Sequence, residues 1–262
     1  MTLSAPTTPP RVRTGVPELD TMLHGGFLPY SINLVEGAPG CGKSTLGMQF
    51  IHAGAQIGEP GIILTFEEFP QQFYRDAAAF GWDFHDLESR GLLKIIMSSP
   101  EVAHADLINV RGGIQHWAER MGARRILIDS ITHFETVGVD PVALRERLYC
   151  LINALKRQGL TTLMTRETPF LLGDTQEPAV NTGIHFMVDT YIMLRYVEIE
   201  SAVQRAVIAI KMRGSPHDSA IRRFDIDAQG MKISKPFRGR EGIMSGTPQR
   251  MAESFVRAFI KR

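Results

Sequence analysis

Cysteine is scarce in this chain of 262 residues, which contains only Cys41 and Cys150. Two cysteines cannot supply the disulfide framework of a small secreted domain, nor a cysteine-rich zinc site. We therefore expect a cytoplasmic protein, because a reducing compartment keeps such thiols free.

Long apolar runs are also missing. No run approaches the roughly 18 residues that a membrane-spanning helix needs. Residues 1–13 are rich in Thr and Pro and lack the apolar stretch of a signal peptide. The sequence thus predicts neither membrane spanning nor secretion. Apolar residues nevertheless make up 44% of the chain and charged residues 22%, which is enough for a sizeable core in one large domain.

The net charge of +1 conceals an uneven distribution of charge along the chain. Residues 1–202 carry 16 basic and 23 acidic side chains, whereas residues 203–262 carry 13 basic and 5 acidic ones. A basic C-terminal part can bind nucleic acid or an acidic ligand. It can equally dock against the acidic face of a second subunit, or the two parts can simply form differently solvated faces of one monomer.

Apolar strands alternate with helical stretches between residues 30 and 167, which predicts an α/β fold. Such alternation is typical of a mainly parallel central sheet with helices on both faces. The later strands would extend this sheet as C-terminal β-hairpins. We expect a flexible lead-in at 1–12, one domain at 13–250 and a short helical tail at 251–262. In chain order, the expected elements are a helix within 14–27, a strand at 31–37, a helix at 43–57, a strand at 61–68, a helix at 70–81, a strand at 92–97, a helix at about 104–121, a strand at 124–131, a helix at 141–158, and strands at 161–167, 189–199, 204–213 and 221–227.

The strongest motif is GAPGCGKS at residues 37–44, a complete G-x-x-x-x-G-K-[ST] pattern between a predicted strand and a predicted helix. Its glycines allow backbone N–H groups to surround phosphate oxygens, and the helix N-terminus adds partial positive charge. Lys43 would contact the β- and γ-phosphates, while the Ser44 hydroxyl would bind Mg²⁺. The sequence therefore predicts an ATP site formed by Gly37, Ala38, Pro39, Gly40, Cys41, Gly42, Lys43, Ser44 and Thr45.

Carboxylates follow two of the predicted buried strands. Asp129 ends the strand RILID, where it could hold the water shell of Mg²⁺. Glu67 and Glu68 end the strand that begins at residue 61, and adjacent acids could divide their work between the metal and the attacking nucleophile. Asp129 could alternatively cap the next helix, and the glutamates could be solvated loop residues.

Further segments give the chain a family resemblance. TGVPELDTMLHGG, TFEEFPQQFYRDAAAFGWD, RILIDSIT, YVEI, KMRGSPHDSAIRRFDI and FRGREGIMSGTPQR occur in this order between residues 14 and 250. With the phosphate-binding loop, they resemble the RecA-superfamily ATPases, and specifically KaiC and its single-domain relatives. The last two segments and YVEI are most similar to the C-terminal ATPase domain of KaiC.

The resemblance implies a RecA-like P-loop NTPase that forms a homohexameric ring with ATP between subunits. It implies that Ser44 and Glu67 lie on the metal side, together with the Asp129 inferred above, and that Glu67 and Glu68 form a catalytic carboxylate pair. Phe80 falls where the family stacks an aromatic ring on adenine. The resemblance also assigns nucleotide contacts to six later residues: Arg205, Lys211, Met212, Arg213, Ser215 and His217. Of these, Lys211 and Arg213 would complete the catalytic site of a neighbouring subunit.

Three features separate this chain from the family pattern and bear on its function. His185 and Phe186 occupy the positions of the adjacent Ser/Thr pair that KaiC phosphorylates on itself, and Arg166 replaces a neutral amide. The chain also resembles one ATPase domain, whereas KaiC has two. We therefore expect a regulatory ATPase with a nucleotide-dependent protein partner.

Two alternatives are a RecA-like DNA-binding protein and a protein kinase. Nucleic-acid binding is disfavoured because the loop at 168–182 contains Asp174 and Glu177 but no basic residue that could neutralise phosphates.

Overall fold

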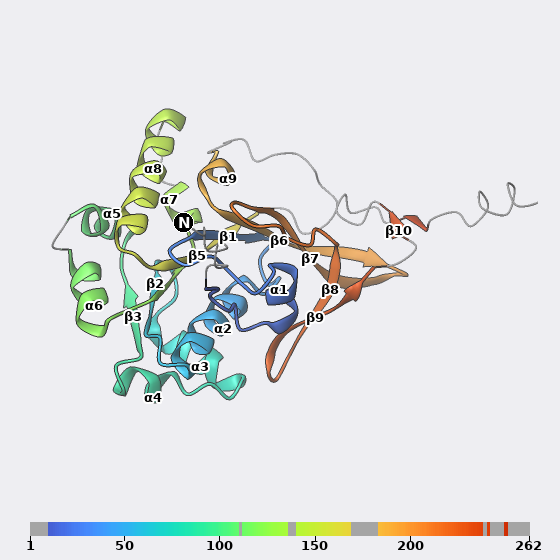
Figure 1. Ribbon diagram of the computed structural model, residues 1–262, viewed down its shortest axis with the longest axis horizontal. Coiled ribbons are helices and arrows are strands. Elements are labelled where there is room, and N and C mark those ends of the chain that lie inside the picture. Colours follow the sequence, from blue (N-terminus) through green and yellow to red (C-terminus); the bar gives the residue numbers. More distant parts are fainter. Residues whose placement is uncertain are drawn as a thin grey trace, which may run out of the picture.

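The computed structural model of the chain describes residues 10–109, 112–135, 140–168, 183–237, 240–241 and 249–250. Nine strands in these residues form one sheet, in the order β3-β2-β4-β5-β1-β6-β7-β8-β9 (Figure 1). The six strands from β3 to β6 are mutually parallel, and β7, β8 and β9 continue the sheet in antiparallel fashion. The strands are β1 (Ile32–Gly37), β2 (Gly61–Thr65), β3 (Leu93–Met97), β4 (Arg125–Asp129), β5 (Thr161–Glu167), β6 (Thr190–Ile199), β7 (Ala202–Met212), β8 (Arg222–Asp227) and β9 (Gly230–Pro236), and the short strands β10 (Arg240–Glu241) and β11 (Gln249–Arg250) pair separately.

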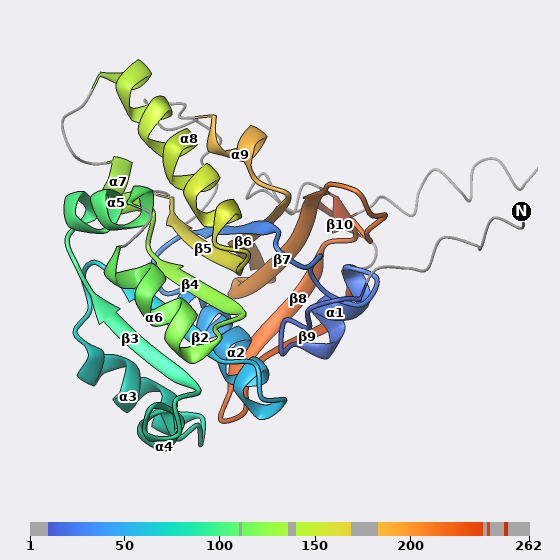
Figure 2. The ribbon, with the colours of Figure 1, turned by 60° about the vertical axis from the view of Figure 1, so that its left-hand side comes forward.

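Helices cover both faces of the sheet, as the alternating sequence pattern predicts (Figures 1 and 2). Two apolar cores result, because alternate residues of each strand point to opposite faces. Val35 of β1 belongs to the core beneath α2, and Leu34 belongs to the core beneath α8. One face carries α1 (Pro17–Met22), α2 (Lys43–Gln56), α3 (Pro70–Ala79) and α4 (Phe84–Ser89), and the other carries α5 (Pro100–Ile108), α6 (Gly113–Met121), α7 (Thr132–Glu135), α8 (Pro141–Arg157) and α9 (Ile184–Met187).

The single helix predicted at about 104–121 is wrong, because the chain forms two helices, α5 and α6, in this region. Gly112 has extended backbone geometry at the start of α6. A side chain there would clash, since an added Cβ would lie 2.0 Å from the carbonyl oxygen of Asp106. The Asp106 carboxylate accepts hydrogen bonds from the backbone N–H groups of Gly113 and Ile114. This side-chain cap stabilises the start of a new helix.

The lead-in predicted at residues 1–12 is described from residue 10 onward. Val12 exchanges two backbone hydrogen bonds with Phe27, and the Arg11 guanidinium donates to the Ser215 hydroxyl at 2.7 Å. These two lead-in residues therefore contact the domain. Residues 1–9 and the predicted tail at 251–262 lie outside the described part. Among the described helices, none combines the length and apolar character that crossing a membrane requires.

Candidate nucleotide site

The GAPGCGKS segment follows β1 directly and leads into α2, so the predicted context of the motif is present. Gly40 and Gly42 adopt positive φ angles of 72° and 105°, which side chains other than glycine rarely tolerate. Gly37 is needed for space, since a Cβ there would lie 2.5 Å from the carbonyl oxygen of Leu194. Cys41 packs inward against Gly37, and burial raises the pKa of its thiol. The loop therefore turns tightly at the N-terminus of α2, the geometry that phosphate binding needs.

Lys43 is buried within this loop. Its ammonium group donates to the Ala38 carbonyl at 3.0 Å and forms an ion pair with Glu167 at 3.4 Å. Glu167 ends β5, the strand beside β1. Glu167 was not among the residues predicted from the sequence to form the site. Its position at the end of a buried strand beside the loop strand was the signal that could have revealed it.

Asp129 ends β4 and faces the start of α2. Burial raises the pKa of its carboxyl group, while hydrogen bonds from Thr165 and Ser44 and the charge of Lys43 act in the opposite direction. The contact with Ser44 joins two of the three residues predicted on the metal side. A hydroxyl and a carboxylate are oxygen ligands of the kind that Mg²⁺ takes alongside nucleotide phosphates. The donor set therefore fits Mg²⁺, although no cluster of three His, Cys, Asp or Glu ligands occurs in the described residues.

Glu67 and Glu68 follow the end of β2. The last residue of β2, Thr65, is paired with Asp129 of the neighbouring strand β4. The Glu68 backbone is held by the Thr65 hydroxyl, whereas the exposed Glu67 side chain lies 3.2 Å from His133. Burial raises the pKa of Glu68, and the nearby carboxylates of Asp129 and Asp76 raise it further. One small cavity of about 50 Å³ brings the acids together; it is lined by Ser44, Glu67, Glu68, Asp129, Ser130 and Glu167.

Phe80 lies at the end of α3 and borders a second cavity, of about 240 Å³. Ser44, Thr45 and Glu68 line the same cavity. The aromatic side chain and the phosphate-binding loop thus share one depression, as an adenine-stacking residue would require. The ring also packs on Trp82, with a centroid distance of 4.8 Å.

The remaining residues predicted to contact the nucleotide lie in β7 or just after it, and they are found at two opposite ends of the sheet. Arg205 lies beside the chain's own loop: its guanidinium is 5.7 Å from the ring of Tyr196. An added Cβ at Gly40 would lie 3.1 Å from the hydroxyl of that tyrosine. Arg205 can therefore contact a nucleotide bound by its own subunit.

Lys211 and Arg213 lie at the opposite end of the sheet. Arg213 donates its backbone N–H to Asp189, whose own N–H donates to Ile32, so Arg213 is level with the start of β1. Gly37 is five residues further along that strand, or about 16 Å at 3.3 Å per residue. Lys211 donates to the carbonyls of His185 and Val188, and Arg213 donates to that of Phe186. Neither cation is directed at the chain's own phosphate-binding loop.

The neighbouring predicted contacts share this distant edge. Met212 is 7% exposed and packs in the core of its own domain. Ser215 accepts a hydrogen bond from Arg11, and His217 is half-buried two residues later. The structure therefore gathers Lys211, Arg213, Ser215 and His217 away from the loop, with Met212 facing inward.

A buried charge network, which the sequence argument missed, lies beneath the phosphate-binding loop. Glu36 of β1 contacts Arg166 of β5 at 3.1 Å and His185 of α9 at 2.6 Å. Arg166 also contacts Glu135 of α7 at 2.9 Å. The side chains of Glu36 and Arg166 are only 7% and 5% exposed. An acid in the mainly apolar strand INLVEG was the available signal. Arg166, which stands where the family pattern has a neutral amide, supplies the cation that pairs with this acid.

This network predicts a specific dependence of stability on pH. Burial alone would raise the pKa of Glu36, but the hydrogen bond with His185 and the charge of Arg166 lower it below its ordinary value of 4.5. Ionised Glu36 therefore stabilises the fold above pH 4.5, and this contribution is lost as pH falls through the lowered folded-state pKa. In urea titrations between about pH 3.5 and 6, the stability difference between wild type and Glu36→Gln should shrink at the acid end. A difference that stays constant with pH would contradict this prediction.

Comparison with known proteins agrees with this site. Residues 12–237 match the family described as "ATPase: KaiC". The chain belongs to the KaiC family. Its KaiC relatives include the circadian clock protein KaiC3 of Synechocystis sp., which is 38% identical over 248 residues, covering 94% of this chain and 48% of that protein. The circadian clock oscillator proteins KaiC of Thermostichus vulcanus and Rippkaea orientalis are 37% and 36% identical over 92% of this chain, covering 46% and 45% of their own lengths.

The family match confirms the predicted RecA-like α/β fold of a KaiC ATPase domain. The chain spans about half the length of the KaiC relatives that it matches.

Proposed function

We propose that this protein binds and hydrolyses ATP with Mg²⁺, at sites formed between the subunits of a homohexameric ring. The observation that carries the proposal is the separation of the two halves of the site. The phosphate-binding loop and its acids lie at one end of the sheet, and Arg213 lies level with Ile32 at the other end. A subunit whose loop binds ATP must therefore receive the cations from its neighbour.

In this mechanism, Lys43 and the backbone N–H groups of the loop bind the phosphates, and Arg205 and Phe80 contact the rest of the nucleotide. Ser44, Asp129 and Glu67 would hold Mg²⁺, which neutralises phosphate charge when bound. Glu68, the more buried acid of the pair, would accept a proton from the attacking water, a role suited to a carboxyl group with a raised pKa. Arg213 of the neighbour would neutralise charge on the transferred phosphoryl group.

We further propose that hydrolysis regulates a partner protein. The names of the relatives connect KaiC proteins with the circadian clock. For this chain, that resemblance supports the more general role of a regulatory ATPase. The protein-kinase alternative is less supported, because His185 is engaged by Glu36 and Phe186 has no hydroxyl. The nucleic-acid alternative is less supported because the loop at 168–182 contains no basic residue; Asp174 and Glu177 of this loop lie outside the described residues.

Assembly tests the proposal most directly. In analytical ultracentrifugation with ATP and Mg²⁺, we expect a species near six subunits, and the ATP turnover per chain should rise with protein concentration as the species forms. Lys43→Ala should weaken assembly, because it removes the buried cation of the loop. High salt should slow assembly, since exposed charges are screened beyond about 8 Å at physiological ionic strength. A monomer under every nucleotide condition would contradict the ring.

A further inference from the structure

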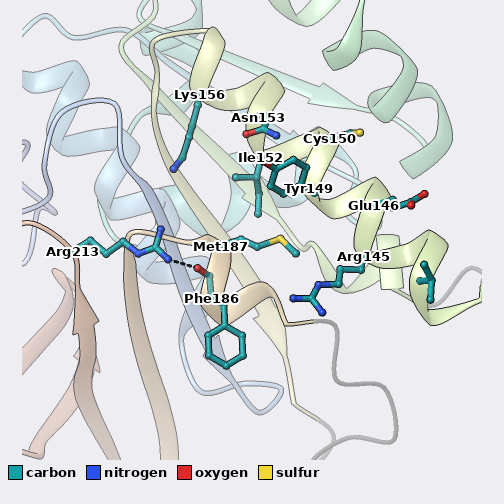
Figure 3. Close-up of a pocket in the computed structure, with 11 residues that line it drawn as sticks. Arg145, Glu146, Tyr149, Cys150, Ile152, Asn153, Lys156, Phe186, Met187 and Arg213 are labelled. Carbon is teal, nitrogen blue, oxygen red and sulfur yellow. Dashed lines mark hydrogen bonds between the residues drawn. The ribbon is translucent and has the colours of Figure 1, made fainter.

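Recognition of a nucleotide involves its sugar as well as its phosphates. Figure 3 shows Arg145, Lys156 and Arg213 along the basic edge of the molecule, where the Arg213 guanidinium donates to the Phe186 carbonyl. Like Lys43 in the loop, these cations are hydrogen-bond donors, and they suit phosphate oxygens. They offer no acceptor to the two hydroxyl groups of a ribose, which therefore need a different kind of side chain.

The cavity of about 240 Å³ that Phe80 borders contains an acceptor of this kind. Asp76 of α3 lines this cavity. Among the described residues of the lining, Asp76 and Glu68 are the two that carry charge. Beyond the loop residues, the other side chains of the lining are apolar: Met48, Phe73, Ala79 and Phe80. Asp76 is thus an isolated polar group on an otherwise apolar wall.

The order of residues along α3 matches the order of groups along a nucleoside triphosphate. Glu68 precedes the helix and also lines the small acidic cavity beside Ser44, so this end suits the phosphates and the metal. Phe80, the predicted adenine contact, lies at the other end of the helix. Asp76 is four residues before Phe80 on the same side of the helix, or about 6 Å along its axis. One turn from the base toward the phosphates is the level of the sugar.

The Asp76 carboxylate has hydrogen-bonding capacity left for a ligand. It accepts from Arg75 Nε through Oδ1 at 2.7 Å, and its side chain is 39% exposed. An ionised carboxylate can accept at about four lone-pair sites on its two oxygens. The exposed Arg75 therefore holds the carboxylate without saturating it. Acidic residues also accept hydrogen bonds from ribose hydroxyls in dinucleotide-binding folds.

We propose that Asp76 binds the ribose hydroxyl groups of the nucleotide and makes the site selective for ribonucleotides. This inference rests on the proposed function, which has ATP bound at the loop. The negative charge of Asp76 also repels a phosphate group at this level of the cavity. It therefore favours one direction of binding, in which the phosphates lie at the loop and the base lies at Phe80.

Equilibrium binding of ATP and of 2′,3′-dideoxy-ATP, each with Mg²⁺, tests this assignment. Both ligands carry the same base and triphosphate, so the ratio of their dissociation constants isolates the two hydroxyl groups. Wild type should bind ATP about tenfold or more tightly than the dideoxy analogue, as expected for hydrogen bonds to a charged acceptor. In Asp76→Ala the ratio should approach unity. Asp76→Asn keeps the shape and one acceptor oxygen, so it should give an intermediate ratio, and it serves as the test if the alanine variant does not fold.

Asp86→Ala is the matched control, because Asp86 is exposed on α4 and pairs with Arg90 at 3.0 Å, much as Asp76 pairs with Arg75. Its ratio should equal that of wild type. Equal binding of both ligands to wild type, or a ratio that the Asp76 variants leave unchanged, would overturn the role of Asp76 but leave the proposed function standing. Variants that alter the preference for ATP over GTP and not this ratio would place Asp76 at the base and overturn the ribose contact. Failure of wild type to bind ATP would overturn both.

Discussion

Replacing Arg213 with alanine should lower the ATP turnover of the assembled protein by about 10³–10⁵-fold, the usual contribution of an arginine supplied to a phosphoryl-transfer site. ATP binding should change little, because Arg213 is level with Ile32 and distant from the loop that binds the phosphates. Steady-state turnover and equilibrium binding of a fluorescent ATP analogue measure the two effects separately. Arg223→Ala serves as a control, since Arg223 is exposed and pairs with exposed Asp225.

Mixing experiments show whether the arginine acts across an interface. Subunits with Arg213→Ala retain the acidic half of the site, and subunits with Glu67→Gln and Glu68→Gln retain the basic half. Mixed rings would contain some interfaces with both intact halves, so part of the activity should return. A strictly monomeric form that hydrolyses ATP at the assembled rate would show that the assignment between subunits is wrong.

Replacing Arg166 with methionine should lower the free energy of unfolding by about 3–5 kcal/mol, which is typical when one partner of a buried ion pair is removed. The change leaves Glu36 and Glu135 without their shared cation, and their side chains are only 7% and 11% exposed. Urea titration at neutral pH measures the loss. The matched surface variant Arg223→Met should cost at most about 1 kcal/mol, because exposed pairs contribute little.

The conservative variant Arg166→Lys separates charge from geometry. Arg166 contacts Glu135 through its Nε and Glu36 through another guanidinium nitrogen. A lysine ammonium is a single point charge and cannot reproduce that planar fork. We expect a loss intermediate between wild type and Arg166→Met. Equal stability of all three proteins would show that the network does not stabilise the fold.

Local patterns in the sequence predicted much of the fold. The segment TTLMTRE was predicted as a strand, and β5 has these bounds; the glycines and lysine of the loop predicted the start of α2. The short α4 was missed, although Asp83 caps it by accepting from Asp86 N–H, because six residues give little helical periodicity. Strand β9 was also missed, since three of its seven residues are polar or charged and its pairing with β8 is a tertiary property.

The candidate site was predictable where its residues belong to a continuous motif or end a strand. Lys43, Ser44 and Asp129 lie together for that reason. The partnership of Glu36 with Arg166 was not predictable, because these residues are 130 positions apart and meet only through the order of β1 and β5. Likewise, Arg205 and Arg213 are only eight residues apart in sequence, and only the register of β6 and β7 shows that they lie toward different ends of the sheet.

The placement of the loop and Arg213 at opposite ends of one sheet has a consequence for how activity would grow with assembly. In the proposed ring, every subunit is an acceptor at one end and a donor at the other. An open row then always contains one complete site fewer than it has subunits, because its first and last members each keep an unmatched half. Closing the row creates one more site without adding a chain. Ring closure itself, and not only association, would therefore be a catalytic event.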